Sequence, residues 1–175
     1  MGDTGSYPAN CPSLSNKMPA FIEQYKEPLD FKIAHASAIC GPNHDEGRIE
    51  KTIRFAKECG FKKIGLAFCV AVKKEAEQIA RLLLQNEFQV ESVVCKVGHC
   101  NRSEILGVES SKNAMCNPVA QAELLNEAGT ELNLVLGLCV GHDSLFIRHS
   151  NAPVSILAVK DHLYNHAPLE YLKVL

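Results

Sequence analysis

The sequence predicts an α/β protein: a small doubly wound, Rossmann-like parallel sheet of about four strands with an N-terminal helical extension. Four short apolar runs form the predicted strands, near residues 62–69, 90–96, 132–139 and 154–160. Their near-continuous Val, Ile and Leu content is typical of strands buried on both faces. Helical patterns separate the runs, and this repetition predicts parallel strands joined by right-handed crossovers.

Three helical segments precede or follow the first predicted strand. Residues 20–38 carry a weak helical pattern that Pro28 interrupts. The segment RIEKTIRFAKECG places apolar residues at helical spacing and ends on Gly60, a typical stop. Residues 72–88 form an amphipathic pattern with alanine, isoleucine and leucine on one side. We therefore expect a helix between the first and second strands.

The remaining helices are marked by their ends. Before the third strand, Asn117 has the side chain of an N-cap, Pro118 suits the first helical position and Gly129 is a stop signal. DSLFIRHS is a short helical segment between the third and fourth strands, and a short helix is expected after Pro168. Every pair of consecutive strands is thus joined through a helix.

Length and composition bound the class of protein. The chain of 175 residues fits an irregular arm over residues 1–19, rich in Pro, Ser, Asn and Gly, followed by a single α/β domain over residues 20–175. A net charge of −2 without a basic run argues against nucleic-acid binding. No apolar run approaches the ~20 residues of a membrane helix, and no secretory signal is visible. We expect a cytoplasmic protein; its oligomeric state is open.

Eight cysteines are the most informative part of the composition. Without a secretory signal, clustered cysteines indicate metal ligands or redox thiols rather than disulfides. Isolated ones are more often buried structural residues. Cys59, at the end of a predicted helix, is assigned to that second class, and Cys11 and Cys40 lie in predicted loops without a role in the site. Cys100 lies in a loop near the predicted site.

Chemically reactive residues follow the predicted strands at the point where each strand ends. They are Cys69 after the first strand, Cys95 and Lys96 after the second, Cys139, His142 and Asp143 after the third, Lys160 and Asp161 after the fourth, and Cys116 before the predicted N-cap. In open α/β sheets, ligands bind outside the carboxyl ends of the strands. The sequence therefore predicts a site at this edge of the sheet.

Four thiolates at one edge favour a soft metal, either zinc or an iron–sulfur cluster. The predicted ligands are Cys69, Cys95, Cys116 and Cys139. Because paired CxxC motifs are absent, the ligands would come from four separate elements. Gly141 would let the backbone turn away from the strand, and His142 would act as a fifth ligand, a proton donor or a partner of a ligand. Asp143 is expected to cap the following helix, whose amides favour a bound anion.

A thiol-dependent enzyme without a metal is the alternative. Cys116 precedes a helix N-terminus, where the pKa of a thiol is lowered. It would then be the nucleophile, with His142 as its base and Lys160 binding an anion. Nucleotide binding is a third hypothesis with less support than the other two, since neither GxGxxG nor GxxxxGK[ST] occurs.

The residues also resemble a known family. IEKTIRFAKECGFKKIGLAFC, VVCKVG, MCNPVAQAELLN, LNLVLGLCVGHDSLF and VKDH together are similar to the domain-of-unknown-function 1847 family, uncharacterised cysteine-rich proteins of anaerobic bacteria and archaea. The resemblance implies a metal-binding protein and no particular reaction. Our own expectation is a cytoplasmic metal-binding protein with a redox or sulfur-handling role in anaerobic metabolism. A small molecule or a redox protein would be its partner.

The family's motif positions fall on particular residues of this chain. Besides the four cysteines, His142 and Lys160, they are Lys96, Asn117, Pro118, Asp143 and Asp161. Through the resemblance we assign Lys96, Asn117 and Asp143 to cofactor binding and Asp161 to the catalytic group. The chain departs from the family pattern at three places. Family members usually begin with several closely spaced cysteines, and here only Asn10-Cys11-Pro12 resembles that region. Val70-Ala71 replaces the usual Gly-Leu, and His162 replaces the usual Arg.

Overall fold

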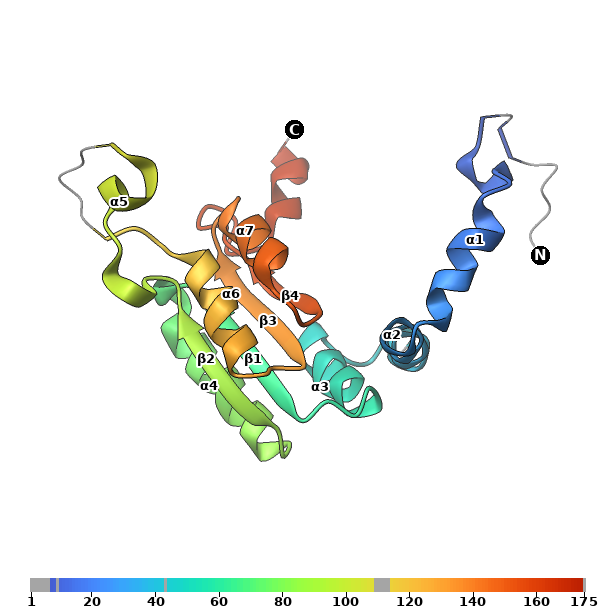
Figure 1. Cartoon of the computed structure of the whole chain (residues 1–175), viewed down its shortest axis with the longest axis horizontal. Helices are drawn as coiled ribbons and strands as arrows, with labels where there is room; N and C mark the ends of the chain where they lie inside the picture. Colours follow the sequence, from blue (N-terminus) through green and yellow to red (C-terminus); the bar gives the residue numbers. More distant parts are fainter. Residues whose placement is uncertain (1–6, 9, 43, 109–113, 175) are drawn as a thin grey trace. The chain divides into compact units, whose positions relative to one another are not determined.

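The computed structural model describes residues 7–8, 10–42, 44–108 and 114–174, and it contains one parallel sheet (Figure 1). The strands are β1 (Lys63–Phe68), β2 (Gln89–Val94), β3 (Leu132–Leu138) and β4 (Val154–Val159). They lie in the order β2-β1-β3-β4, and every neighbouring pair is parallel. The predicted α/β class with four parallel strands is confirmed.

Apart from α5, which lies in a stretch expected to be a polar loop, the helices fall where the sequence patterns predict them. They are α1 (Met18–Glu23), α2 (Pro28–Cys40), α3 (Arg48–Glu58), α4 (Lys73–Gln85), α5 (Arg102–Leu106), α6 (Pro118–Glu127) and α7 (His142–His149). Short 3-10 segments are η2 (Pro12–Leu14), η3 (Gln24–Lys26), η4 (Val70–Val72), η5 (Val97–His99) and η6 (Pro168–Val174). Pro28 begins α2 and so separates it from α1, as its position in the sequence indicates.

The chain divides into two compact units, residues 1–45 and 46–175. The first contains α1 and α2, whose apolar side chains are largely exposed, as at Phe21 and Phe31. The second contains the whole sheet and its helices. The predicted arm over residues 1–19 includes residues 1–6 and 9, which lie outside the described residues, and the single domain over residues 20–175 stays a prediction. Across the described ranges, no helix is both long and apolar enough to cross a bilayer.

Helices cover both faces of the sheet in the second unit (Figure 1). On one face α6 and α7 pack against each other. On the other, side chains of α3 and α4 meet Leu134 of β3 and Leu157 of β4 around a small internal void. Every residue of β3 is buried, and Ile64, Leu66 and Ala67 of β1 are fully covered. This two-sided burial explains why the strands are continuous apolar runs.

The helix ends confirm two sequence signals and correct a third. The Asn117 side chain accepts a hydrogen bond of 3.0 Å from the Ala120 N–H, as an N-cap does. Gly129 follows α6 with a positive φ, as a stop signal requires. Asp143, expected as the cap of α7, is instead its second residue, and Gly141 is the N-cap with φ of 83°. The Asp143 carboxylate still accepts hydrogen bonds from the N–H groups of Gly141 and Ser144.

The last strand, β4, is shielded by a side chain from α3. Arg48 donates hydrogen bonds to the Ile156 carbonyl and the Ser155 hydroxyl. All residues of β4 are only half-buried, because β3 pairs with this strand on one side alone. The guanidinium therefore satisfies a backbone carbonyl of the outermost strand.

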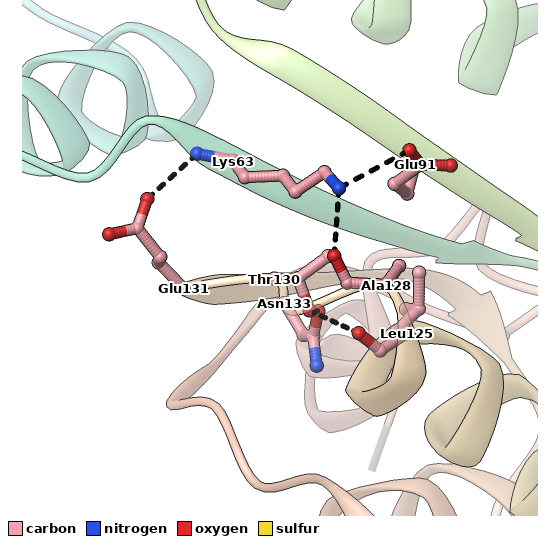
Figure 2. A network of polar contacts seen from close by, with 7 residues as sticks. All are labelled: Lys63, Glu91, Leu125, Ala128, Thr130, Glu131 and Asn133. Carbon is pink, nitrogen blue, oxygen red and sulfur yellow. Dashed lines mark hydrogen bonds and ion pairs between the residues drawn. The ribbon is translucent and has the colours of Figure 1, made fainter.

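At the amino edge of the sheet, polar contacts hold β1 to the ends of α6 and β3 (Figure 2). The Glu131 carboxylate accepts hydrogen bonds from the backbone N–H groups of Lys62 and Lys63. The Lys63 ammonium donates to the Ala128 carbonyl at 2.7 Å and lies 3.6 Å from the Glu91 carboxylate of β2. These contacts fix where β1 and β3 begin relative to each other.

A buried asparagine fits into the sheet because its neighbour is a glycine. Asn133 of β3 is fully buried and pairs in register with Gly65 of β1. Its side chain accepts a hydrogen bond of 2.7 Å from the Thr130 hydroxyl and donates one of 2.8 Å to the Ser150 hydroxyl. A Cβ at position 65 would lie 1.9 Å from the Asn133 Oδ1 and 2.9 Å from a methyl group of Leu125. Only glycine leaves room for this network.

We predict that Gly65→Ala destabilises the protein by about 1–3 kcal/mol, the usual cost of overpacking a core. Urea unfolding measures the loss as a lower midpoint with an unchanged slope. Gly47→Ala is the matched control, since it meets only the flexible Glu50 carboxylate and has φ of −75°. Equal midpoints for the two variants would contradict this account of the Gly65–Asn133 pair.

Candidate functional site

Two cysteines stand side by side where β1 and β2 end. Cys69 directly follows β1 and Cys95 directly follows β2, and the register pairs the preceding residues Phe68 and Val94. The ladder continues past the strands, because the Cys95 N–H donates to the Phe68 carbonyl at 2.9 Å. The two thiols are hydrogen-bonded to each other. Parallel pairing alone thus brings these sulfurs together from positions 26 residues apart in the sequence.

A third cysteine joins them from the segment that precedes α6. The Asn117 N–H donates to the Cys95 carbonyl at 2.7 Å, so this segment runs beside the end of β2. The Cys95 thiol hydrogen-bonds to Cys116 as well as to Cys69. The three sulfurs form a row with Cys95 in the middle, which we call the thiol row.

Gln121 holds the first turns of α6 against the strand ends. Its side chain is fully buried and donates to the Val93 carbonyl at 2.7 Å and, more weakly, to the Phe68 carbonyl at 3.4 Å. Because Val93 and Phe68 belong to β2 and β1, this amide fixes the start of the helix over both strands. Cys116 is therefore positioned by the backbone of Cys95 on one side and by α6 on the other.

Lys160 connects the thiol row with the end of β3. Its ammonium donates a hydrogen bond of 3.1 Å to the Cys69 sulfur and also hydrogen-bonds to Cys139. Its backbone N–H donates to the Leu138 carbonyl at 3.2 Å, which extends the β3–β4 ladder to the residue that follows β4. The four cysteines predicted as ligands and Lys160 are thus linked side chain to side chain, as the strand order places them.

A bulge near the end of β3 directs the backbone toward Cys139. Gly137 has φ of 65°, in the left-handed region, and the β3–β4 register shifts on either side of Leu136. A Cβ there would approach a methyl group of Val72 to 3.1 Å. Bulges of this kind redirect a strand beside a site. Gly141 also has a positive φ, but no atom lies within 4 Å of the place its Cβ would take, so backbone conformation rather than room explains this glycine.

The pKa values of Cys69 and Cys95 are shifted in opposite directions. Burial is the largest influence on Cys69 and acts to raise the pKa of its thiol. The Ala71 N–H and the hydrogen-bonded, positively charged Lys160 outweigh burial, and the pKa of Cys69 lies below its ordinary value. Burial, reinforced by the neighbouring sulfurs, raises the pKa of Cys95 to about 12. At neutral pH Cys95 is therefore a protonated thiol, with a single hydrogen to donate to one neighbouring sulfur at a time.

The remaining predicted site residues lie near this edge with other contacts. Lys96 is exposed. The Asp161 carboxylate accepts from the backbone N–H groups of Leu163 and Tyr164. His142 is half-buried, and its backbone N–H donates to the Cys139 carbonyl. The catalytic and cofactor-binding roles assigned to these residues, and to Asp143 and Asn117, stay predictions.

Some contacts at the site had no clear signal in the sequence. The backbone N–H of Val70 donates to the Cys95 sulfur at 3.5 Å, and the backbone N–H of Ala71 donates to Cys69. The side chains of Val70 and Ala71 have no polar atoms, so no pattern in the sequence predicts these contacts. Cys100 accepts a hydrogen bond of 3.2 Å from the Asn117 amide. The sequence did carry a signal for the bulge in β3, since Gly137 lies inside the apolar run LNLVLGLCV and a glycine within a strand pattern indicates a bulge.

Within the second unit, Cys59 lies away from the thiol row. Cys59 is buried at the C-terminal end of α3, before β1 begins, and so belongs to the opposite edge of the sheet. Cys11 and Cys40 belong to the first unit. Cys59 therefore serves as a matched control for the cysteines of the site.

The side chains of the site have the donor chemistry that soft metals require, but they are not arranged as a closed metal site. Among the described residues, no three Cys, His, Asp or Glu side chains converge as ligands of one ion. The sulfurs of the thiol row instead make hydrogen bonds to one another and to Lys160. What the structure shows is a cluster of close cysteines.

Comparison with known proteins places the chain among uncharacterised relatives. A family described as "Protein of unknown function (DUF1847)" matches residues 11–157. The chain is also 42% identical over 150 residues to the uncharacterized protein MJ0455 of the archaeon Methanocaldococcus jannaschii, covering 83% of this chain and 77% of that protein. The matched residues include the whole thiol row.

We predict that Lys160→Met raises the pKa of Cys69, because the thiolate loses both a hydrogen bond and a positive charge. Each unit of increase lowers the thiolate fraction about tenfold at a pH below the pKa. Alkylation of Cys69 followed across pH by peptide mass spectrometry should show its midpoint at higher pH. In the control variant, Lys173→Met, an exposed lysine paired with Glu170 is removed, and the midpoint should not move. Superimposable profiles for the two variants would contradict the role of Lys160.

Proposed function

The chain belongs to the domain-of-unknown-function 1847 family, and on this premise we propose that its cysteine-lined edge binds a soft metal, as zinc or as an iron–sulfur cluster. The observation that supports the proposal most directly is the thiol row of Cys69, Cys95 and Cys116, with Cys139 joined to it through Lys160. Thiolate sulfur is the donor that zinc and iron–sulfur clusters share. The activity proposed for such a metal site is a redox or sulfur-handling reaction.

The charge of the surroundings fits such a site. Four thiolates around a divalent ion carry a net negative charge, and Lys160 places a cation beside two of them, Cys69 and Cys139. Backbone N–H groups of Val70 and Ala71 add donors to the sulfurs of Cys95 and Cys69. Hydrogen bonds to ligand sulfurs orient them and tune the metal. These groups would remain beside the sulfurs when a metal is bound.

Metal binding requires the sulfurs to exchange their present partners for the metal. Burial, reinforced by the neighbouring sulfurs, raises the pKa of Cys95 to about 12, so this thiol holds a proton before a metal binds. A bound cation displaces such protons, since metal ligation uses the thiolate. Binding should therefore release protons and weaken as pH falls.

We predict that protein purified without oxygen carries a metal in stoichiometric amount. An iron–sulfur cluster would give a broad absorption band in the violet together with iron and sulfide, whereas zinc would leave the protein colourless. Elemental analysis and an absorption spectrum distinguish the two. Folded protein without metal under these conditions would contradict the metal proposal.

We further predict that Cys139→Ser abolishes metal retention, while Cys59→Ser and Cys11→Ser leave it unchanged. Cys59 is the sharper control, because it lies in the same unit as the site but at the other edge of the sheet. Metal content per chain after gel filtration measures the effect. Equal retention in all three variants would show that Cys139 is not a ligand.

A thiol-dependent enzyme is the second candidate, favoured by the partial exposure of Cys116 beside the N-terminus of α6. Cys116 would be the nucleophile, with His142 as base and Lys160 and Asp161 completing the catalytic group. Alkylation of Cys116 well below the pH of an ordinary thiol, dependent on His142 and indifferent to a chelator, would support it. If Cys116 is a ligand instead, a chelator should be what makes it reactive.

A further inference from the structure

We propose that Cys116, Cys95 and Cys69 form a relay for thiol–disulfide exchange, in which Cys116 accepts oxidising equivalents from a small disulfide and passes them through Cys95 to Cys69. The proposal goes beyond metal binding and does not depend on it. It assigns the thiol row an activity, a substrate class and an order of reaction.

The order follows from contact and exposure. Cys95 is the only member of the row that touches both of the others, so exchange between Cys116 and Cys69 passes through it. Cys116 is partly exposed, whereas Cys95 and Cys69 are 2% and 3% exposed. An external disulfide therefore meets Cys116 first.

Both links of the row suit a disulfide. Cys69 and Cys95 continue the register of adjacent parallel strands, which lie about 4.8 Å apart. This spacing falls within the roughly 4.4–6.8 Å between the Cα atoms of disulfide-bonded cysteines. The Asn117 N–H donates to the Cys95 carbonyl and so holds the adjacent Cys116 beside Cys95.

The reaction is a sequence of sulfur exchanges. The deprotonated Cys116 sulfur attacks the small disulfide, so that a mixed disulfide forms and one substrate thiolate leaves and takes up a proton. The Cys95 sulfur then attacks the Cys116 sulfur, and the second substrate thiol leaves with the proton of Cys95. Finally the Cys69 sulfur attacks Cys95 and expels Cys116, which takes up the proton that Cys69 gives up. The substrate gains two electrons and two protons in becoming two thiols, and Cys69 and Cys95 lose them.

Lys160 is a positioning residue in this scheme. Its ammonium hydrogen-bonds to Cys69, which holds that sulfur beside Cys95. It also hydrogen-bonds to Cys139, so the cation keeps a sulfur partner once Cys69 has entered a disulfide. The end of the relay is thus reached without leaving the half-buried ammonium unpaired.

The test is to trap each step with a variant. Full-length reduced protein is mixed with one molar equivalent of hydroxyethyl disulfide in the presence of a chelator, quenched with acid and mapped by peptide mass spectrometry. The native chain should end with Cys69 linked to Cys95 and Cys116 free. Cys69→Ser should stop at a Cys95–Cys116 disulfide, and Cys95→Ser at a mixed disulfide on Cys116.

Two further variants complete the series. Cys116→Ser should slow the oxidation of Cys69 and Cys95 at least about tenfold, since the two thiols that remain in the row are buried. Cys59→Ser should behave as the native chain does. The relay is wrong if native protein keeps a mixed disulfide on Cys116, or if Cys69 is oxidised equally fast in Cys116→Ser. The metal content of the same preparation, measured before the chelator is added, tests the metal proposal. The disulfide map is read after the metal has been removed, so it tests the relay separately.

Discussion

The parallel pairing of β1 with both β2 and β3 is the constraint on which the site depends. β1 is an inner strand, and its register with each neighbour sets which residues meet at the carboxyl edge. The strand order reverses direction at β1 and β3, the place where open α/β sheets bind ligands. Cys69 and Cys139 follow these two strands. The amino-edge contacts and the Gly65–Asn133 fit therefore act on the site from a distance, by holding the register.

The sequence was sufficient for the fold because the strands are buried on both faces and the helix ends carry local signals. Continuous apolar runs, Asn117 and Gly129 each determine local structure almost independently of context. The edge at which Cys69, Cys95 and Cys139 would stand followed from parallel topology. The partners of each sulfur did not follow, since the Lys160–Cys69 contact depends on side-chain conformation and on the bulge at Gly137. The helix boundary at Asp143 was misplaced because Gly141 can begin a helix in a conformation that other residues avoid.

The site is assembled from distant parts of the chain. Cys69 and Lys160 touch across 91 positions of sequence, and Cys95 and Cys116 come from two further elements. In a zinc finger the ligands are close in sequence and the metal organises the fold. Here the sheet must form first, so the sulfurs meet only in the folded domain. Oxidation or metal capture before folding would join different cysteines.

The contact between Arg48 and β4 has a consequence for assembly between molecules. An outermost strand offers its free backbone groups to strands of other chains, which is a common route to aggregation. Arg48 already donates to the Ile156 carbonyl and the Ser155 hydroxyl. A fifth strand that paired with β4 would have to break the hydrogen bonds of the Arg48 guanidinium to this strand. Growth of this sheet by recruitment of a foreign strand is therefore disfavoured at that side.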